Sequence, residues 1–160
     1  MTDWVRGTGE RELVEYLDFQ CPYCRTASGA IKAVVLNDLA GRVRLRVRHF
    51  PLREKHPRAD ATARAAEAAG RQGRFWEMHD LLFARFEAVT DDDLASYAAE
   101  LGLAADRFAA DLADPALIAA IEEDREAGLA AGVTGTPGLF LDGERYTGFY
   151  DRETLLDVLF

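Results

Sequence analysis

Cysteine is scarce in this chain: among 160 residues it occurs only as Cys21 and Cys24. A framework of structural disulfides needs several cysteine pairs spread along a short chain, so the sequence excludes a disulfide-stabilised mini-protein. Long apolar runs are missing too, because no window approaches the roughly 18 uncharged apolar residues of a membrane-spanning helix. No repeat or low-complexity tract interrupts the chain, whose length is that of one domain.

Positive charge is also in short supply. The chain carries 19 lysine and arginine residues against 28 aspartate and glutamate residues, which gives a formal net charge of −9. Because proteins bind nucleic-acid backbones mainly through clustered lysine and arginine, this balance argues against a nucleic-acid partner. Hydrophobic residues make up 49% of the chain and charged residues 29%, which is ordinary globular usage and excludes a disordered chain.

A secretory signal is the last absence. The first twenty residues lack the basic start, the apolar stretch and the small-residue cleavage site of a signal peptide. If Met1 is the native start, we expect a cytoplasmic protein, in which a pair of thiols would be mostly reduced. If a signal has been removed, we expect the periplasm or another extracytoplasmic compartment instead.

Hydrophobic periodicity predicts the elements on either side of the two cysteines. Residues 13–19 form a short run of aromatic and branched side chains that ends abruptly at Cys21, which is typical of a buried strand. The preceding residues 2–9 are a polar lead-in. Pro22 stands where a helix accepts proline, in its first turn, and apolar residues at helical spacing extend this helix as far as Gly41.

Residues 42–50 alternate strictly between apolar side chains and arginines, which predicts a strand with one buried and one solvated face. The arginines of the solvated face are Arg42, Arg44, Arg46 and Arg48. A charged row of this kind suits the edge of a sheet, where it prevents pairing with other chains. The alternative interpretation is a basic ribbon for an anionic partner, and the net negative charge of the chain argues against it.

The segment 57–132 has the pattern of consecutive helices. Within it, Thr90 is a candidate N-cap with Asp93 three residues on. The segment is followed by a hairpin around Asp142-Gly143 and by a last helix capped by Asp151. The order strand, helix, strand, helical block, hairpin and helix predicts an α/β fold with a mixed sheet.

The Cys21-Pro-Tyr-Cys24 segment carries the chemistry. At the start of a helix, Cys21 lies beside unpaired backbone N–H groups and the positive end of the helix dipole, which stabilise a thiolate and lower its pKa. Cys24 lies one helical turn on, within reach of Cys21 but deeper. A thiolate that attacks a disulfide forms a mixed disulfide, which a second nearby thiol can resolve. We therefore expect a dithiol redox site with an exposed nucleophile and a sheltered resolving thiol.

A metal site is the competing interpretation of the two thiols. Structural zinc has four ligands, and the chain holds no second cysteine pair. His49, His56 and His79 would complete such a site only by a coincidence of folding. We predict no metal and no cofactor, and we expect the three histidines to serve in packing or hydrogen bonding.

Four segments, taken together, resemble a known family. They are Asp-Phe-Gln-Cys-Pro-Tyr-Cys at 18–24, Arg-His-Phe-Pro-Leu at 48–52, Phe-Trp-Glu-Met-His at 75–79 and Gly-Val-Thr-Gly-Thr-Pro at 132–137. In order they resemble the DsbA-like branch of the thioredoxin superfamily, especially bacterial DsbA-family proteins and the thioredoxin-like domain fused to some Na⁺/H⁺ antiporters. The resemblance implies a thioredoxin fold with an inserted all-helical subdomain. Its core would comprise residues 1–56 and 133–160, and the insertion residues 57–132.

The resemblance also implies roles for the residues of the motif. Cys21 matches the nucleophile of the family and Cys24 its resolving cysteine. Pro22 and Tyr23 lie between them and would tune the redox properties, with Pro-Tyr here where the founding periplasmic oxidant has Pro-His. Losing that histidine removes one donor to the sulfur of Cys21.

Three further residues enter through the resemblance. Thr136 and Pro137 match the cis-proline loop that faces the disulfide, where the backbone of a substrate peptide pairs. Glu15 matches a buried acid beneath the active site; a buried Glu15 would have a raised pKa and could exchange protons with Cys24. From the sequence alone, a strand acid with its carboxylate in solvent is an equal alternative for Glu15.

The implied function is a thiol–disulfide oxidoreductase that exchanges disulfides with cysteines of protein or peptide substrates. We expect a monomer with an unidentified redox partner and no membrane insertion. Two alternatives stay open. One is a glutathione-linked reductase, because Pro-Tyr also separates the cysteines of glutaredoxins, although these proteins lack a helical insertion. The other is a redox-sensing module that docks a partner, although docking alone requires neither cysteine.

Overall fold

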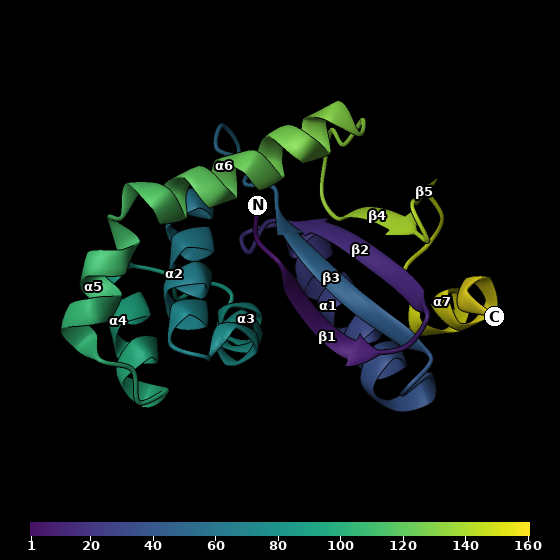
Figure 1. Cartoon of the computed structure of the whole chain (residues 1–160), viewed down its shortest axis with the longest axis horizontal. Coiled ribbons are helices and arrows are strands. Elements are labelled where there is room, and N and C mark those ends of the chain that lie inside the picture. The colour runs from purple at the N-terminus through teal and green to yellow at the C-terminus, as the bar shows by residue number, and fades with distance from the viewer.

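The structure is a computed structural model that describes residues 1–160. Its core is built on a five-stranded mixed sheet. Its strands are β1 (Trp4–Thr8), β2 (Arg11–Leu17), β3 (Val43–His49), β4 (Gly138–Leu141) and β5 (Glu144–Tyr146). They lie in the order β1-β3-β2-β4-β5 (Figure 1). Only β2 and β3 run parallel; the other neighbouring pairs are antiparallel. The sheet is therefore mixed, as the order of elements predicts.

Seven α-helices accompany the sheet: α1 (Pro22–Ala33), α2 (Ala59–Arg71), α3 (Phe75–Ala84), α4 (Asp91–Glu100), α5 (Ala105–Leu112), α6 (Pro115–Ala130) and α7 (Arg152–Leu159). Helices α1 and α7 cover one face of the sheet, and α2 to α5 form a group beside it (Figure 1). Helix α6 runs from this group back to the end of the sheet near β4 (Figure 1). None of the helices is both long and apolar enough to cross a lipid bilayer.

The alternation predicted for β3 is present. Val43, Leu45 and Val47 are buried and belong to one hydrophobic core that includes Leu13 of β2 and Ile31 of α1. Because consecutive side chains of a strand point to opposite faces, the arginines between them point away from α1. The apolar face of the sheet thus carries the helix that begins with the Cys-x-x-Cys segment.

The polar lead-in predicted for residues 2–9 is wrong, because Trp4–Thr8 forms β1 and pairs antiparallel with β3. Trp4 stacks on Phe75 of α3, with ring centroids 4.7 Å apart. Its indole N–H donates to Glu67 of α2 at 2.7 Å. The side chains that hold this strand come from helices far along the chain, so no local pattern signals it.

Because β1 covers its outer side, β3 is not an edge strand, and the prediction of a charged edge is wrong. Its arginines are half-buried between β1 and β2 and form cross-strand ion pairs. Arg44 donates to Glu12 of β2 at 2.8 Å, and Arg46 contacts Glu12 at 3.2 Å and also Asp3. The positive charge of this row is therefore partly neutralised within the sheet.

The predicted helix caps are confirmed. Thr90 and Asp93 form a capping box in which each side chain accepts the other's backbone N–H. Asp151 accepts the backbone N–H of Thr154 at 3.0 Å and starts α7. The helix predicted to reach Gly41 is α-helical only to Ala33 and continues as a π-helical turn, Val34–Asp38.

Asp124 docks α6 onto the sheet. Its side chain is fully buried and accepts hydrogen bonds from the backbone N–H of His49 at 3.0 Å, the N–H of Thr2 at 2.9 Å and the hydroxyl of Thr2. A carboxylate can remain buried only where such donors replace its lost hydration. One side chain thus joins α6 to β3 and to the N-terminal segment, and α6 in turn leads into the loop before β4.

We expect Asp124→Ala to lower the free energy of unfolding by about 3 kcal/mol, because it leaves the buried N–H groups of Thr2 and His49 without an acceptor. Urea denaturation followed by circular dichroism measures the loss. The matched control is Glu126→Ala, which removes an exposed acid of the same helix and should change stability little. Equal losses for the two variants would contradict this account of how α6 is held.

Candidate redox site at Cys21 and Cys24

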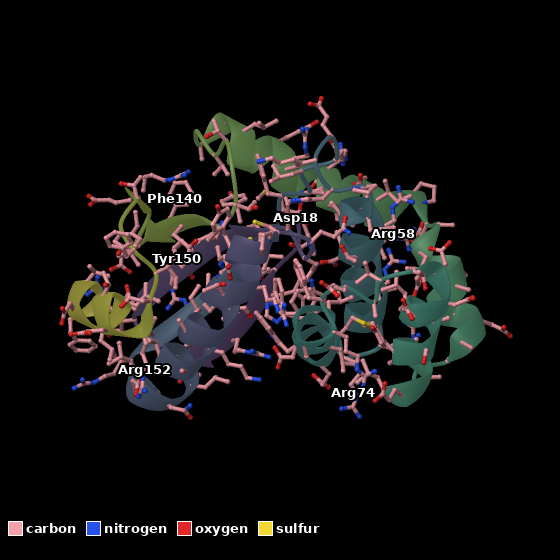
Figure 2. The ribbon with its side chains drawn as sticks, turned by 180° about the vertical axis from the view of Figure 1, so that it is seen from behind. Asp18, Arg58, Arg74, Phe140, Tyr150 and Arg152 are labelled. Atoms are coloured by element: carbon pink, nitrogen blue, oxygen red, sulfur yellow. The ribbon has the colours of Figure 1, made fainter.

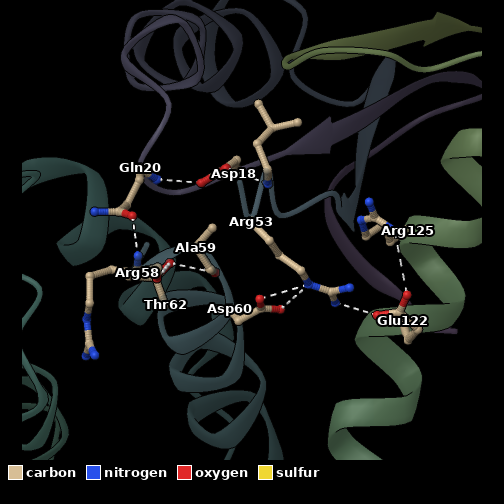
Figure 3. A network of polar contacts seen from close by, with 10 residues as sticks. Asp18, Gln20, Arg53, Arg58, Ala59, Asp60, Thr62, Glu122 and Arg125 are labelled. Carbon is tan, nitrogen blue, oxygen red and sulfur yellow. Dashed lines mark hydrogen bonds and ion pairs between the residues drawn. The ribbon is translucent and has the colours of Figure 1, made fainter. Parts of the chain in front are cut away.

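The turn between β2 and α1 places Cys21 as the N-cap residue of α1, with Pro22 in the first turn. Asp18 holds this turn: its buried carboxylate accepts the backbone N–H of Gln20 at 2.8 Å and of Leu52 at 2.9 Å. Its carbonyl accepts the N–H of Cys21 at 3.1 Å. Figure 3 shows the contact of Asp18 with Gln20. The end of β2, the proline and the buried carboxylate together therefore fix the position of the first cysteine.

The two cysteines are free thiols that lie 3.9 Å apart. Both cysteines are buried: Cys24 is fully inaccessible to solvent, and only 3% of Cys21 is exposed. The prediction of an exposed nucleophile is therefore wrong. The reason is the loop before β4, whose Thr136 carbonyl accepts a hydrogen bond from the Cys21 thiol at 3.5 Å and covers it. Cys21 nonetheless lines a surface cleft of about 880 Å³, and Cys24 does not.

The surroundings shift the two thiols in opposite directions. The pKa of Cys21 is lowered to about 5, chiefly by a hydrogen bond from the Cys24 thiol. Burial acts in the opposite direction and raises this pKa. The Thr136 side chain and the backbone N–H groups of Cys24 and Tyr23 lower it further. Burial, followed by the hydrogen bond to Cys21, raises the pKa of Cys24 well above its ordinary value. Near neutral pH the site therefore holds one thiolate, on Cys21, and one thiol, on Cys24.

The Thr136 hydroxyl is suited to this charge distribution. It is buried and has no hydrogen-bond partner in the protein, and it lowers the pKa of the nearby Cys21 thiol. A hydroxyl can donate to a thiolate, whereas its neighbouring carbonyl accepts only from a thiol. The peptide bond between Thr136 and Pro137 is cis. The structure thus brings Thr136 to Cys21, although the two residues lie 115 positions apart along the chain.

Glu15 is buried beneath the two thiols, which decides between the two interpretations of this residue. Neither carboxylate oxygen has a hydrogen-bond partner. Burial, and after it the negative charge of Cys21, raises the pKa of Glu15 to about 8. The charge of Glu15 in turn contributes to the raised pKa of Cys24. Glu15 is therefore mostly protonated when Cys21 carries the charge.

Pro22 and Tyr23 face outward. Both are exposed, and 64% of Tyr23 is accessible to solvent. The phenol ring of Tyr23 therefore lies at the surface, and its backbone N–H, rather than its side chain, supports the thiolate of Cys21. An exposed ring beside a reactive sulfur is available to whatever molecule approaches that sulfur.

The three histidines have structural partners. His49 Nε2 lies 2.6 Å from a Glu67 carboxylate oxygen, and His56 Nδ1 lies 2.8 Å from Asp18. His79 is buried in a cluster of aromatic rings. The molecule has no group of three or more histidine, cysteine or acidic side chains arranged to hold a metal ion.

Sequence patterns do not single out Tyr150, which follows the hairpin. Burial, and after it the negative charges of Cys24 and Cys21, raises the pKa of its phenol. Tyr150 lines a surface pocket together with Thr26 and Ala30 of α1, and it lies on the same side of the molecule as Phe140 of β4 (Figure 2). Tyr150 belongs to an irregular loop without a motif, so only the folded chain shows that it lies beside α1.

The raised pKa of Glu15 predicts a pH-dependent stability difference. Between pH about 4.5 and about 8 the native protein keeps a proton that the unfolded chain has lost, so the contribution of Glu15 to stability falls as pH rises through this window. Glu15→Gln removes this dependence. We expect the free energy of unfolding of the Glu15→Gln variant, relative to that of the wild type, to rise with pH across this window, by at most about 1.4 kcal/mol per pH unit.

Urea denaturation at a series of pH values measures this difference, and any constant cost of burying the amide does not affect its slope. Glu10→Gln, at an exposed acid, is the control and should run parallel to the wild type. A Glu15→Gln curve that also runs parallel would show that Glu15 has an ordinary pKa.

Comparisons with known proteins identify the family. The family model of the DSBA-like thioredoxin domain matches residues 12–160. The Na(+)/H(+) antiporter NhaA of Herminiimonas arsenicoxydans is 43% identical over 162 residues, covering 98% of this chain and 25% of the antiporter. NhaA 1 of Salinispora arenicola is 45% identical over 155 residues, covering 96% and 24%. The chain thus spans about a quarter of the length of these curated relatives.

Solved structures agree with this assignment. A thioredoxin-like oxidoreductase from Silicibacter pomeroyi is 29% identical, with a TM-score of 0.86 over 98% of this chain and 90% of that one. The oxidoreductase DsbA of Xylella fastidiosa is 25% identical, with a TM-score of 0.76 over 94% and 82%. The fold and the resemblance inferred from the sequence are both confirmed. The chain belongs to the family of DSBA-like thioredoxin domains.

Proposed function

We propose that this domain is a thiol–disulfide oxidoreductase acting on cysteines of protein or peptide substrates, with Cys21 as nucleophile and Cys24 as resolving thiol. The observation that carries the proposal is the opposite shift of two adjacent thiols, whose pKa is lowered to about 5 at Cys21 and raised at Cys24. Of the two cysteines, only Cys21, whose pKa is lowered, is among the residues that line the cleft. Similarity to oxidoreductases of this fold supports the reaction class.

The reaction proceeds in two exchanges. The Cys21 thiolate attacks one sulfur of a substrate disulfide, forms a mixed disulfide and releases the other substrate sulfur as a thiolate. Cys24 then loses its proton, attacks the sulfur of Cys21 and releases the remaining substrate thiolate. The Cys21–Cys24 disulfide has formed, and two electrons have passed to the substrate. The reverse sequence oxidises a substrate dithiol.

Glu15 is the proposed proton acceptor for the second exchange. Cys24 cannot attack while it is a thiol, and its raised pKa makes spontaneous ionisation unfavourable. Forming the mixed disulfide removes the charge of Cys21, which is one cause of the raised pKa of Glu15. Glu15 then ionises more readily and becomes available to take the proton of Cys24.

The lowered pKa of Cys21 also bears on the direction of transfer. Stabilising the thiolate stabilises the reduced form of the pair relative to its disulfide, and so raises the reduction potential. The disulfide form is therefore a stronger oxidant than a pair with ordinary thiols would be. Equilibration with glutathione buffers of known potential measures this property directly.

The pKa of Cys21 should depend on Cys24. We expect Cys24→Ala to raise it from about 5 toward the ordinary value of 9, because the largest stabilising hydrogen bond is lost. Cys24→Ser keeps a donor and should raise it less. The ultraviolet absorbance of the thiolate, followed across pH, measures both shifts. An unchanged titration in Cys24→Ala would mean that the helix end alone stabilises the thiolate.

The two cysteines should also differ in turnover. We expect Cys21→Ser to abolish insulin reduction in a dithiothreitol-coupled assay. Cys24→Ser should accumulate a mixed disulfide that is visible on non-reducing gels, because only the thiol of Cys24 releases the substrate. Running the assay with glutathione in place of dithiothreitol separates a glutathione-linked reductase, which would turn over with glutathione alone. Full activity of Cys24→Ser in the dithiothreitol assay would refute the two-cysteine mechanism.

A further inference from the structure

The cleft at Cys21 differs in charge from the rest of the molecule. It is bounded by the start of α1, by residues 52–56 between β3 and α2, by residues 134–136 before β4 and by Arg125 of α6. Three positively charged side chains line it, Arg53, Lys55 and Arg125, against one negatively charged side chain, Glu54. Few of the lining residues are apolar. A locally positive cleft thus surrounds the reactive sulfur of a chain whose net charge is −9.

Arg53 has a structural task in this cleft. Its guanidinium donates to Asp60 of α2 at 2.8 Å and also to Glu122 of α6 (Figure 3). Arg125 approaches the same Glu122 at 3.7 Å. These pairs hold the segment 52–56 against two helices, and they leave little of the Arg53 charge for a ligand.

Lys55 and Arg125 retain positive charge for a ligand. Lys55 is exposed and forms no ion pair with the protein. Arg125 has a buried Nε without a hydrogen-bond partner, and its only carboxylate contact is the 3.7 Å approach to Glu122. His56, between Lys55 and α2, is turned toward Asp18 by its 2.8 Å contact and does not compete with them. The cleft therefore presents two cations, Lys55 and Arg125, and Glu54 is the only acidic residue that lines it.

We propose that this cleft selects cysteine-containing peptides that carry an aspartate or glutamate next to the reacting cysteine, with Lys55 as the main contact for the carboxylate. The proposal rests on the proposed function, because it names the substrate class of the same site. Charges at the rim of a binding surface act mainly on the rate of association and on its salt dependence. The preference is local, since salt screens exposed charges beyond about 10 Å at 0.1 M.

The test uses three peptides that differ only beside the cysteine, with aspartate, asparagine or lysine there. Each peptide cysteine is joined to 2-thiopyridine, a leaving group without charge. The Cys21 thiolate attacks the peptide sulfur, forms a Cys21–peptide disulfide and releases 2-thiopyridone, whose absorbance gives the single-turnover rate. We expect the aspartate peptide to react about threefold to fivefold faster than the asparagine peptide at low salt, and the lysine peptide more slowly.

Lys55→Glu should lower the ratio of the aspartate-peptide rate to the asparagine-peptide rate to one or below. General damage to the protein slows both reactions and leaves this ratio unchanged. The matched control is Arg42→Glu, which makes the same change of charge. Arg42 precedes β3 and Cys21 follows β2. Because β2 and β3 run parallel, the two residues lie at opposite ends of the sheet. Arg42→Glu should keep the wild-type ratio. High salt should reduce the ratio in wild type toward one.

The outcomes separate this proposal from the proposed function. Equal rates for all three peptides, each well above that of a free thiol, would overturn the acidic preference and leave the oxidoreductase standing. An aspartate preference that persists in Lys55→Glu would also overturn it. Rates no higher than that of a free thiol for every peptide would instead remove the proposed function itself.

Discussion

The redox site depends on one electrostatic constraint: Cys21, Cys24 and Glu15 lie together in a buried region that tolerates a single negative charge. Hydrogen bonds decide which group carries it, and most of them point at Cys21. Once Cys21 is ionised, its charge helps to raise the pKa of both other groups. The thiolate, the thiol and the protonated carboxyl are therefore one coupled system, and removing the charge from Cys21 redistributes the protons of the other two.

The fold supplies this constraint through the ends of neighbouring strands. The pairing of β2 with β4 aligns Glu15 with Leu139 and Tyr16 with Gly138. The residues that precede β4 must then lie beside those that follow β2, which brings Thr136 to Cys21 although they are 115 positions apart. A central strand buried on both sides keeps Glu15 from water, and that burial is the first cause of its raised pKa.

Local features of this arrangement could be predicted from the sequence, and long-range ones could not. The Cys-x-x-Cys segment at a helix start, the Thr90 cap and the alternation of β3 follow from residues a few positions apart. Strand β1 and the cover over Cys21 depend on contacts with distant segments, and the residue patterns missed both. For Glu15, alternation assigns a face but not whether that face is covered, so both interpretations stood until the helices were placed. The role of the Thr136–Pro137 loop came from family resemblance alone.

The helices between β3 and β4 do more than pack beside the sheet, because they build a wall of the cleft. Arg53 ties the segment 52–56 to α2 and α6, and Asp124 ties α6 to β3. Helix α6 also carries Arg125 and leads into the loop that covers Cys21. Its position therefore affects both the charge that faces a substrate and the hydrogen bonds at the sulfur. A change in the docking of α6 alters access to Cys21 and the reactivity of its thiolate together, which couples the helical segment to the chemistry at the end of β2.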